Sequence, residues 1–186
     1  EGYAEFLSRH GGDFYIYAPK RDSHLRKNWR EPHPKNTWNE LLRLRQTCRD
    51  EGVGFGLGLS PFEVHDQWNA STRQELREKL FQLRELDLTF LGLFFDDMRG
   101  APDLAEKQIE IVQFVQERMS NQLLFCPTYY SPDPVLDKVF GERPPEYLEK
   151  IGAGLSNQVE IFWTGNKVIP AAITAAELDE VAKILK

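Results

Sequence analysis

Two adjacent aspartates occupy the position in this chain that best suits chemistry. Asp96 and Asp97 directly follow the apolar run from Leu88 to Phe95, and Gly100 comes shortly after them. Because successive side chains of a strand point to opposite faces, both carboxylates reach one pocket only if the chain turns there, which a strand end near Gly100 permits. Two carboxylates in an apolar pocket suit a division of work, with one as proton donor and one as anion. The pattern therefore predicts an acid–base site.

Two other uses of this pair are less well supported. Helix capping is already served by Asp103, and a hard divalent cation needs more carboxylates than this region supplies. The four histidines show neither HExxH nor HxH spacing, so each is expected in a loop or on the surface rather than as a ligand: His10, His24, His33 and His65. We therefore predict neither a metal nor a cofactor.

The elements that position the aspartates are predicted from five apolar runs. They are nearly continuous in hydrophobicity, as strands covered on both faces should be: Phe14–Ala18, Val53–Leu59, Leu88–Phe95, Leu123–Pro127 and Val159–Trp163. A polar turn and a helical pattern follow each run, and the turns recur at intervals of 32 to 40 residues, near Lys20, Ser60, Asp96, Thr128 and Thr164. This repeat predicts βα units with parallel strands.

The helices are predicted from capping boxes and apolar stripes. The capping-box spacing occurs at Thr37–Glu40, Asp103–Glu106 and Thr174–Glu177. Cys48 belongs to an apolar stripe, so we expect a buried structural thiol. Gly52 is expected to end its helix in a left-handed conformation.

Two architectures fit a βα repeat, an open doubly wound sheet and a closed (β/α)₈ TIM barrel. No GxGxxG motif or P-loop follows any run, and reactive side chains end several different runs, which favours the barrel. A barrel needs eight strands and about 250 residues, whereas five βα units are visible here. We therefore predict one incomplete barrel domain over residues 1–186, which lacks the first strand and the last two, with Glu1–His10 as the helix after the missing first strand.

Composition excludes some partners. The 186 residues are 41% hydrophobic, which fits one globular domain, and the net charge of −6 argues against nucleic-acid binding. There is no stretch of about 20 apolar residues, so no membrane span is predicted. The start of the chain lacks the pattern of a signal peptide, which favours a cytoplasmic location. The oligomeric state is left open.

Five motifs in one order carry a family resemblance. They are Tyr15–Lys20 (YIYAPK), Trp29–Pro32 (WREP), Phe95–Asp97 (FDD), Phe125–Thr128 (FCPT) and Trp163–Gly165 (WTG). Together they resemble glycoside hydrolase family 84, the O-GlcNAcase-like β-N-acetylglucosaminidases, some of which are labelled hyaluronidases. Tyr129 departs from the pattern, since the family carries Glu at that place.

The resemblance implies a TIM-barrel hydrolase that removes terminal β-linked N-acetylglucosamine from a glycan or glycoprotein. It implies a retaining, substrate-assisted mechanism, in which Asp96 holds the acetamido N–H and the acetamido oxygen forms an oxazoline. Asp97 would protonate the leaving oxygen and later activate water. Among the remaining residues Lys20 would bind a sugar hydroxyl, Tyr130 the acetamido oxygen, and Thr164 would line the pocket. Cys126, in the FCPT motif, is counted with these substrate-binding residues.

Two alternatives remain beside the hydrolase. The family's glycine-rich first strand and a later strand with further sugar ligands are absent from these 186 residues. The chain could therefore be a non-catalytic glycan-binding barrel or an inactive fragment of such an enzyme. Retention of Asp97 favours the hydrolase, because a binding module has no use for an acid at the leaving oxygen.

Overall fold

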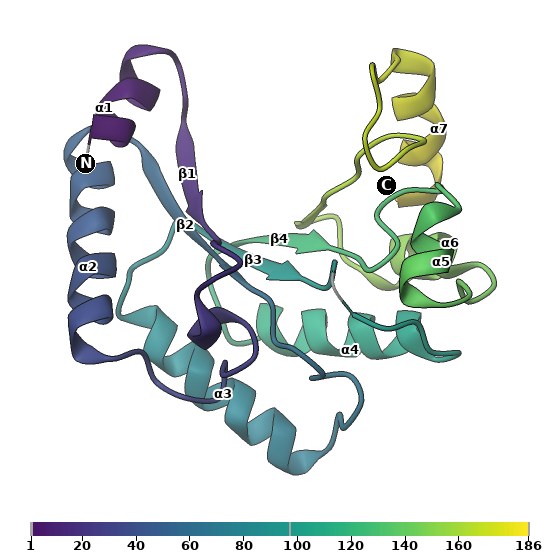
Figure 1. The fold of residues 1–186 in the computed structure, drawn as a ribbon, viewed down its shortest axis with the longest axis horizontal. Helices are drawn as coiled ribbons and strands as arrows, with labels where there is room; N and C mark the ends of the chain where they lie inside the picture. Colours follow the sequence, from purple (N-terminus) through teal and green to yellow (C-terminus); the bar gives the residue numbers. More distant parts are fainter. Residues whose placement is uncertain (1, 97, 186) are drawn as a thin grey trace.

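The computed structural model describes residues 2–96 and 98–185, in which five parallel strands form one sheet (Figure 1). The strands are β1 (Phe14–Tyr17), β2 (Gly54–Leu59), β3 (Phe90–Phe94), β4 (Gln122–Cys126) and β5 (Val159–Ile161). The helices are α1 (Gly2–Arg9), the 3-10 helix η1 (Ser23–Leu25), α2 (Lys35–Asp50), α3 (Ala70–Arg84), α4 (Leu104–Gln116), α5 (Val135–Phe140), α6 (Tyr147–Gly154) and α7 (Ala175–Leu185). Each strand coincides with one of the five predicted apolar runs, except that β4 begins one residue before its run, at Gln122.

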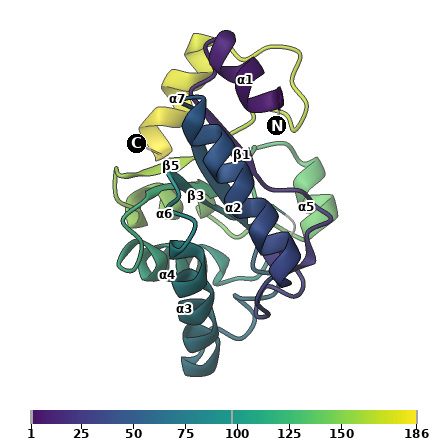
Figure 2. The ribbon, with the colours of Figure 1, turned by 90° about the vertical axis from the view of Figure 1, so that its left-hand side faces the viewer.

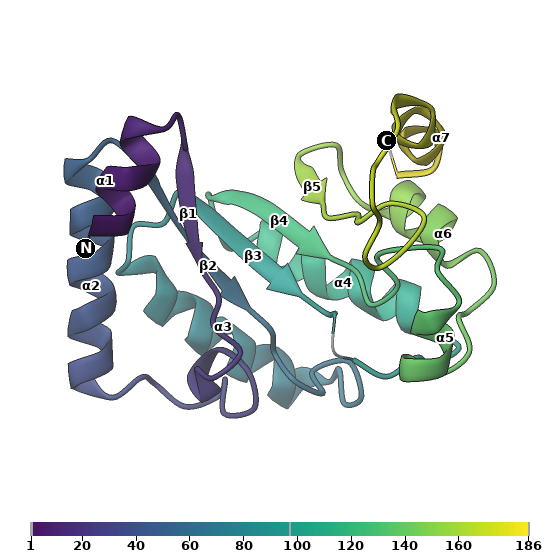
Figure 3. The same ribbon diagram turned by 45° about the horizontal axis from the view of Figure 1, so that its top comes forward.

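Strand order distinguishes the two predicted architectures. A doubly wound sheet reverses its strand order at a switch point and carries helices on both faces. Here neighbouring strands follow chain order from β1 to β5 without reversal, and every pair is parallel. The sheet curves, and α2, α3 and α4 lie on its outer face (Figures 1 and 3). These are successive βα units of a barrel, so the predicted α/β fold class is confirmed. The predicted domain limits stay a prediction.

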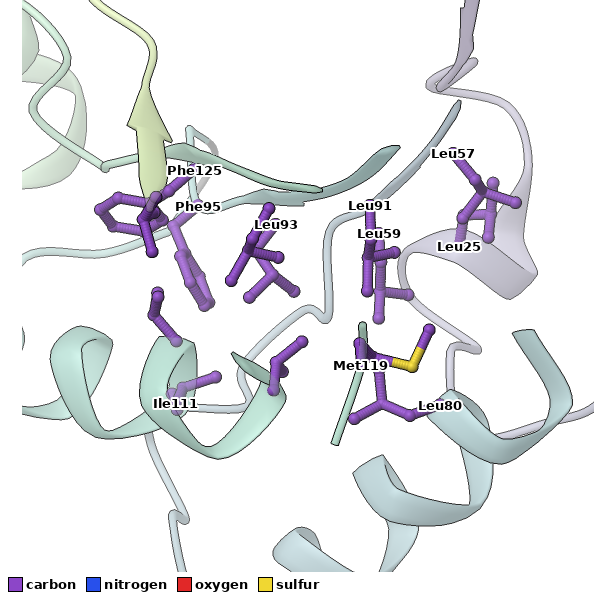
Figure 4. Close-up of a cluster of buried hydrophobic side chains, with 14 of the residues drawn as sticks. Leu25, Leu57, Leu59, Leu80, Leu91, Leu93, Phe95, Ile111, Met119 and Phe125 are labelled. Carbon is purple, nitrogen blue, oxygen red and sulfur yellow. The ribbon is translucent and has the colours of Figure 1, made fainter. Parts of the chain in front are cut away.

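The core lies between the outer face of the sheet and the helices. Register aligns Leu59, Leu93 and Phe125 in one row across β2, β3 and β4, and all three side chains are buried. Leu80 of α3 and Ile111 of α4 pack beneath them (Figure 4). Full burial of one such side chain contributes roughly 1.5–3 kcal/mol to stability. This apolar layer therefore determines which side chains of each strand point toward the helices.

The inner face of the sheet is shaped by glycines. Gly58 of β2 pairs in register with Gly92 of β3. A β-carbon on Gly58 would lie 2.5 Å from the ring of Phe94, and one on Gly92 would lie 2.6 Å from it. The missing side chains therefore make the room that the Phe94 ring occupies.

Several local predictions are confirmed. Thr174 and Glu177 form the predicted capping box, since each side chain bonds the other residue's backbone N–H, at 3.3 and 2.8 Å. Cys48 is buried, and Gly52 has a φ of +70° at the end of α2. At the edge of the sheet formed by β1, α1 lies beside β1 and α2 (Figure 2).

Two capping predictions are wrong. Thr37 is the third residue inside α2 and not its N-cap, because the helix begins at Lys35 with Pro34 as N-cap. Proline lacks an N–H and has a fixed φ, so it starts a helix without a side-chain cap. Asp103 does precede α4, but its carboxylate makes no capping bond and pairs with Lys107 at 3.1 Å instead.

Within residues 2–96 and 98–185, no helix is long and apolar enough to cross a membrane.

Candidate active site

A pocket of about 370 Å³ lies where β3, β4 and β5 end. Its lining residues come from the segments at those three strand ends: Phe94, Asp96, Cys126, Tyr130, Phe162, Thr164 and Val168. The carboxyl ends of parallel strands meet at one edge of a sheet, which is where barrel enzymes carry their active sites. Four of the residues predicted from sequence thus line one pocket.

The carboxylate of Asp96 is held on one side. Its Oδ2 atom accepts a hydrogen bond from Lys20 Nζ at 2.6 Å, and this lysine follows β1, two strands away in the sheet. The side chain of Asp96 is 25% exposed and that of Lys20 is 57% exposed. The Oδ1 atom of Asp96 is buried and has no hydrogen-bond partner among the described residues. One oxygen is therefore fixed by an ion pair, while the other can accept a hydrogen bond from a ligand.

Asp97 lies outside the described residues, and its predicted role stays a prediction. The backbone at Gly100, three residues later, is closely packed. Gly100 donates its N–H to the carbonyl of Phe140 at 2.7 Å, and a β-carbon on Gly100 would collide with the hydroxyl of Tyr129. Only a glycine fits at this point of the turn.

Tyr129, the departure from the family pattern, is a buried structural residue. Its side chain is fully buried, and its hydroxyl donates to the carbonyl of Gly141 at 2.7 Å. Burial raises the pKa of this phenol above its usual value, so it stays protonated. Tyr129 is not among the lining residues of the pocket, so the departure leaves the pocket's lining unchanged.

Aromatic rings form one wall of the pocket. Phe94 and Phe162 meet edge to face, with ring centroids 5.7 Å apart. The segment after β5 is tied to the segment after β4, because the N–H of Thr164 donates to the carbonyl of Tyr130 at 3.2 Å. The Thr164 hydroxyl donates to the carbonyl of Lys167 at 3.1 Å, which leaves its oxygen able to accept a bond from a sugar hydroxyl.

The lining role of Phe94 and Val168 was missed in the sequence. A signal existed for Phe94, since it stands two residues before Asp96 and alternate residues of a strand share a face. No comparable signal existed for Val168, which reaches the pocket on a loop. Its N–H is held by the carboxylate of Asp133 at 3.2 Å.

One cluster outside the pocket has ligand types that suit a metal. The potential ligand atoms of Asp22, His24 and His33 lie within 4.8 Å of one another. The Asp22 carboxylate already accepts bonds from the His24 N–H at 3.0 Å, from His33 Nε2 at 3.2 Å and from the Tyr17 hydroxyl at 3.4 Å. These donors satisfy the carboxylate without a cation. We therefore interpret the cluster as a brace for the loop that carries Lys20.

Two of the four histidines lie in loops, as predicted, and have buried side chains. His33 is 6% exposed and His65 is 2% exposed, although both lie in loops. Burial lowers the pKa of both imidazoles, so that they are neutral near pH 7, and His33 also bonds to Asp22. A neutral imidazole can be buried at much lower cost than a charged one, which explains how two loop histidines can lie in the interior.

Comparisons with known proteins identify the family and the fold. The sequence model of a family described as beta-N-acetylglucosaminidase matches residues 2–186. Protein O-GlcNAcase of Rattus norvegicus and that of Mus musculus are each 30% identical to the chain over 185 residues. The alignment covers 92% of this chain and 20% of each relative, so the chain spans about a fifth of their length.

Solved structures show the same fold. The structure of CpGH84B superposes with a TM-score of 0.85 at 23% identity, over 99% of this chain and 34% of that one. An O-GlcNAc hydrolase variant from Thermobaculum terrenum superposes with a TM-score of 0.83 at 29% identity, over 99% and 41% of the two chains. Since the family match runs through nearly every residue, the chain belongs to the beta-N-acetylglucosaminidases of glycoside hydrolase family 84, as its five motifs predicted.

Proposed function

We propose that the protein hydrolyses terminal β-linked N-acetylglucosamine carried by a glycan or glycoprotein. The observation that carries this proposal is the buried Oδ1 atom of Asp96, which lacks a hydrogen-bond partner among the described residues beside a 370 Å³ pocket. An acetamido N–H is a donor that such an oxygen can accept, and the acetyl methyl group suits the apolar side chains of Phe94 and Val168. A buried acceptor without a partner is costly, so a ligand that supplies the donor gains affinity.

The first half of the reaction forms an oxazoline. Asp96 accepts the acetamido N–H, which orients the group and increases electron density on its carbonyl oxygen. That oxygen attacks the anomeric carbon while the bond from this carbon to the aglycone oxygen breaks. Asp97 gives its proton to the leaving oxygen. The substrate's own amide thus replaces a protein nucleophile, an exception to the scheme with a carboxylate nucleophile.

The second half reverses the roles. Asp97, now anionic, takes a proton from water, and the water oxygen attacks the anomeric carbon. The oxazoline opens and the acetamide is restored. Two displacements at one carbon give net retention of configuration. By the family resemblance, Lys20 binds a sugar hydroxyl, Tyr130 binds the acetamido oxygen, and Thr164 and Cys126 line the pocket.

The test is a series of nitrophenyl N-acetylglucosaminides whose acetyl methyl carries zero, one, two or three fluorines. Fluorine withdraws electron density from the attacking oxygen, so we expect kcat/KM to fall steeply with each fluorine, since the attack develops in the transition state. Asp96→Asn should lower the rate strongly. The matched control is Asp103→Asn, because Asp103 is also an aspartate paired with a lysine, at 3.1 Å, but lies outside the pocket.

Three results would contradict the proposal in different ways. An equal rate across the fluorinated series would exclude attack by the acetamide. A sugar found covalently attached to Asp96 or Asp97 by mass spectrometry would identify a protein nucleophile. Binding of N-acetylglucosamine without hydrolysis of any glycoside would favour the non-catalytic glycan-binding barrel.

A further inference from the structure

A closed ring of buried hydrogen bonds lies beneath the end of β3. The backbone N–H of Thr128 donates to the hydroxyl of Tyr147 at 3.1 Å, and that hydroxyl donates to Oε1 of Gln108. Nε2 of Gln108 then donates to the hydroxyl of Thr128 at 2.8 Å. The three side chains are 0 to 1% exposed and come from α4, the segment after β4, and α6.

One hydrogen bond leads from the ring to the active site, and it is called the exit bond below. The Thr128 hydroxyl donates to the carbonyl of Phe95 at 2.7 Å, and Phe95 is the residue directly before Asp96. The N–H of Phe95 donates to the carbonyl of Cys126 at 2.9 Å, and its buried ring meets Phe125 edge to face. Both backbone polar groups and the side chain of Phe95 are therefore fixed where the chain leaves β3.

The direction of every bond in the ring is determined by chemistry. A backbone N–H can only donate, so the Tyr147 oxygen must accept from Thr128 and its own proton must go to an acceptor, Oε1 of Gln108. The amide nitrogen is then turned toward the Thr128 hydroxyl. That hydroxyl accepts from the amide, so its proton is directed to the carbonyl of Phe95. Burial raises the pKa of Tyr147 far above its usual value, which keeps the phenol a donor at every pH of an enzyme assay.

We propose that Gln108, Thr128 and Tyr147 are positioning residues, which hold the end of β3 so that the two aspartates that follow Phe95 are correctly placed. The inference rests on the proposed hydrolysis. None of the three is among the lining residues of the pocket, so they act through the backbone of Phe95 rather than on the substrate. A displacement of about 1 Å at a reacting group can cost around 100-fold in rate, so a bond that fixes this backbone affects catalysis.

The test removes the exit bond without a change in shape. Thr128→Val replaces the hydroxyl by a methyl group, and Thr128→Ser keeps the hydroxyl. Rates are measured on the full-length protein with a series of aryl N-acetylglucosaminides of increasing leaving-group pKa. We expect Thr128→Val to lower kcat by roughly 10- to 100-fold, with little change in KM. The loss should grow with leaving-group pKa, because a displaced acid serves poor leaving groups worst. Thr128→Ser should restore most of the rate.

A second variant reverses the polarity of the ring. Gln108→Glu puts a carboxylate oxygen where the amide nitrogen now donates, so the Thr128 hydroxyl should turn its proton toward the glutamate. The Phe95 carbonyl would then lose the bond from Thr128 and keep the longer one from the N–H of Met98, at 3.3 Å. The same dependence on leaving group is expected. Because a buried charge can prevent folding, Gln108→Met serves as an uncharged variant of similar length, which also breaks the ring.

The matched control is Thr72→Val in α3. Thr72 is buried, and its hydroxyl also donates to a backbone carbonyl, that of Gln67, at 2.6 Å, but it lies outside the pocket. A variant that only lowers the folded fraction slows all substrates by one factor, so Thr72→Val should leave the leaving-group dependence unchanged.

The outcomes separate the two proposals. If the wild-type protein hydrolyses the glycosides and Thr128→Val keeps the wild-type leaving-group dependence, the positioning role is refuted while the proposed function stands. If the wild-type protein hydrolyses none of them, the proposed function is refuted, and the positioning role is refuted with it.

Discussion

Gly58→Ala tests the packing that shapes the pocket. The added β-carbon would lie 2.5 Å from the ring of Phe94 and 2.7 Å from the β-carbon of Ala18, so the ring must move. Phe94 lines the pocket beside Asp96, and its edge meets Phe162. A substitution in β2, which contributes no lining residue to the pocket, should therefore disturb both stability and substrate binding.

The magnitude follows from a comparison within one strand. Gly54 and Gly58 lie on the same face of β2, but a β-carbon on Gly54 would lie 3.3 Å from the side chain of Thr89 and 3.4 Å from the carbonyl oxygen of Asp13, distances that a small shift relieves. Replacing a strand glycine by alanine stabilises the folded state by about 0.5–1 kcal/mol, because alanine loses less backbone entropy on folding. This contribution is the same at both positions and cancels in the comparison. Overpacking costs typically 1–3 kcal/mol. We expect Gly58→Ala to be less stable than Gly54→Ala by about that amount.

Thermal unfolding and steady-state kinetics measure the effect. For a domain of this size, 1 kcal/mol shifts the melting temperature by about 2–4 °C. Gly58→Ala should also raise KM, whereas Gly54→Ala should not. The double variant Gly58→Ala/Phe94→Leu should recover part of the lost stability, because the smaller side chain vacates the contested space. Equal melting temperatures for the two alanine variants would show that Phe94 does not lie over Gly58, and the reasoning would be refuted.

Four further predictions concern other parts of the molecule. Asp97→Asn should slow glycosides with poor leaving groups by about 10²–10⁴-fold while partly sparing the first step with nitrophenyl glycosides; equal slowing of both would exclude Asp97 as the acid. Burial lowers the pKa of Lys79 to about 8, so between pH 8 and pH 10 the unfolded chain binds a proton that the folded chain has lost. Stability in denaturant titrations should therefore rise with pH in this window, by up to about 2–3 kcal/mol at about 1.4 kcal/mol per pH unit, and the rise should vanish in Lys79→Met. Above pH 10 the trend should reverse, because burial raises the pKa of Tyr17 to about 12 and the folded chain then holds the extra proton. The isolated 186-residue chain should self-associate through β1 and β5, the edges of its sheet, and a monodisperse monomer in light scattering would contradict this. Hydrolysis should survive dialysis against a chelator, since no step of the proposed mechanism uses a metal.

The fold could be predicted because the strands leave a strong signal in the sequence. Residues on both faces of β2 and β3 are apolar and at least partly buried, or are glycine, so each strand is an unbroken apolar run in the sequence. The regular spacing of these runs then requires crossover helices and parallel strands. Helix starts were harder to predict, because a capping box is only a spacing of residue types. Thr37 and Glu40 have that spacing, yet the helix begins after Pro34, three residues earlier than a cap at Thr37 would start it.

Lining residues of the pocket could be predicted from the sequence only where they stand at the ends of strands. Asp96, Cys126 and Thr164 each stand at or just after a strand end, and parallel strands bring such positions together. Gln108 and Tyr147 lie instead on helices, where a buried polar side chain looks in sequence like any exposed one. Their importance depends on the direction of hydrogen bonds between segments 20 to 39 residues apart, which no local pattern records.

The alternation of β3 links the core to the site. Leu91, Leu93 and Phe95 face the helices and are fully buried, so the intervening residues must face inward. Phe94 and Asp96 are the last two of that inward set, and both line the pocket. A slip of one residue in the register would turn Asp96 into the core and bring leucines to the pocket. The apolar packing that stabilises the barrel unit therefore also points the Asp96 carboxylate into the pocket. The ring around Thr128 holds the carbonyl of Phe95, the residue between Phe94 and Asp96.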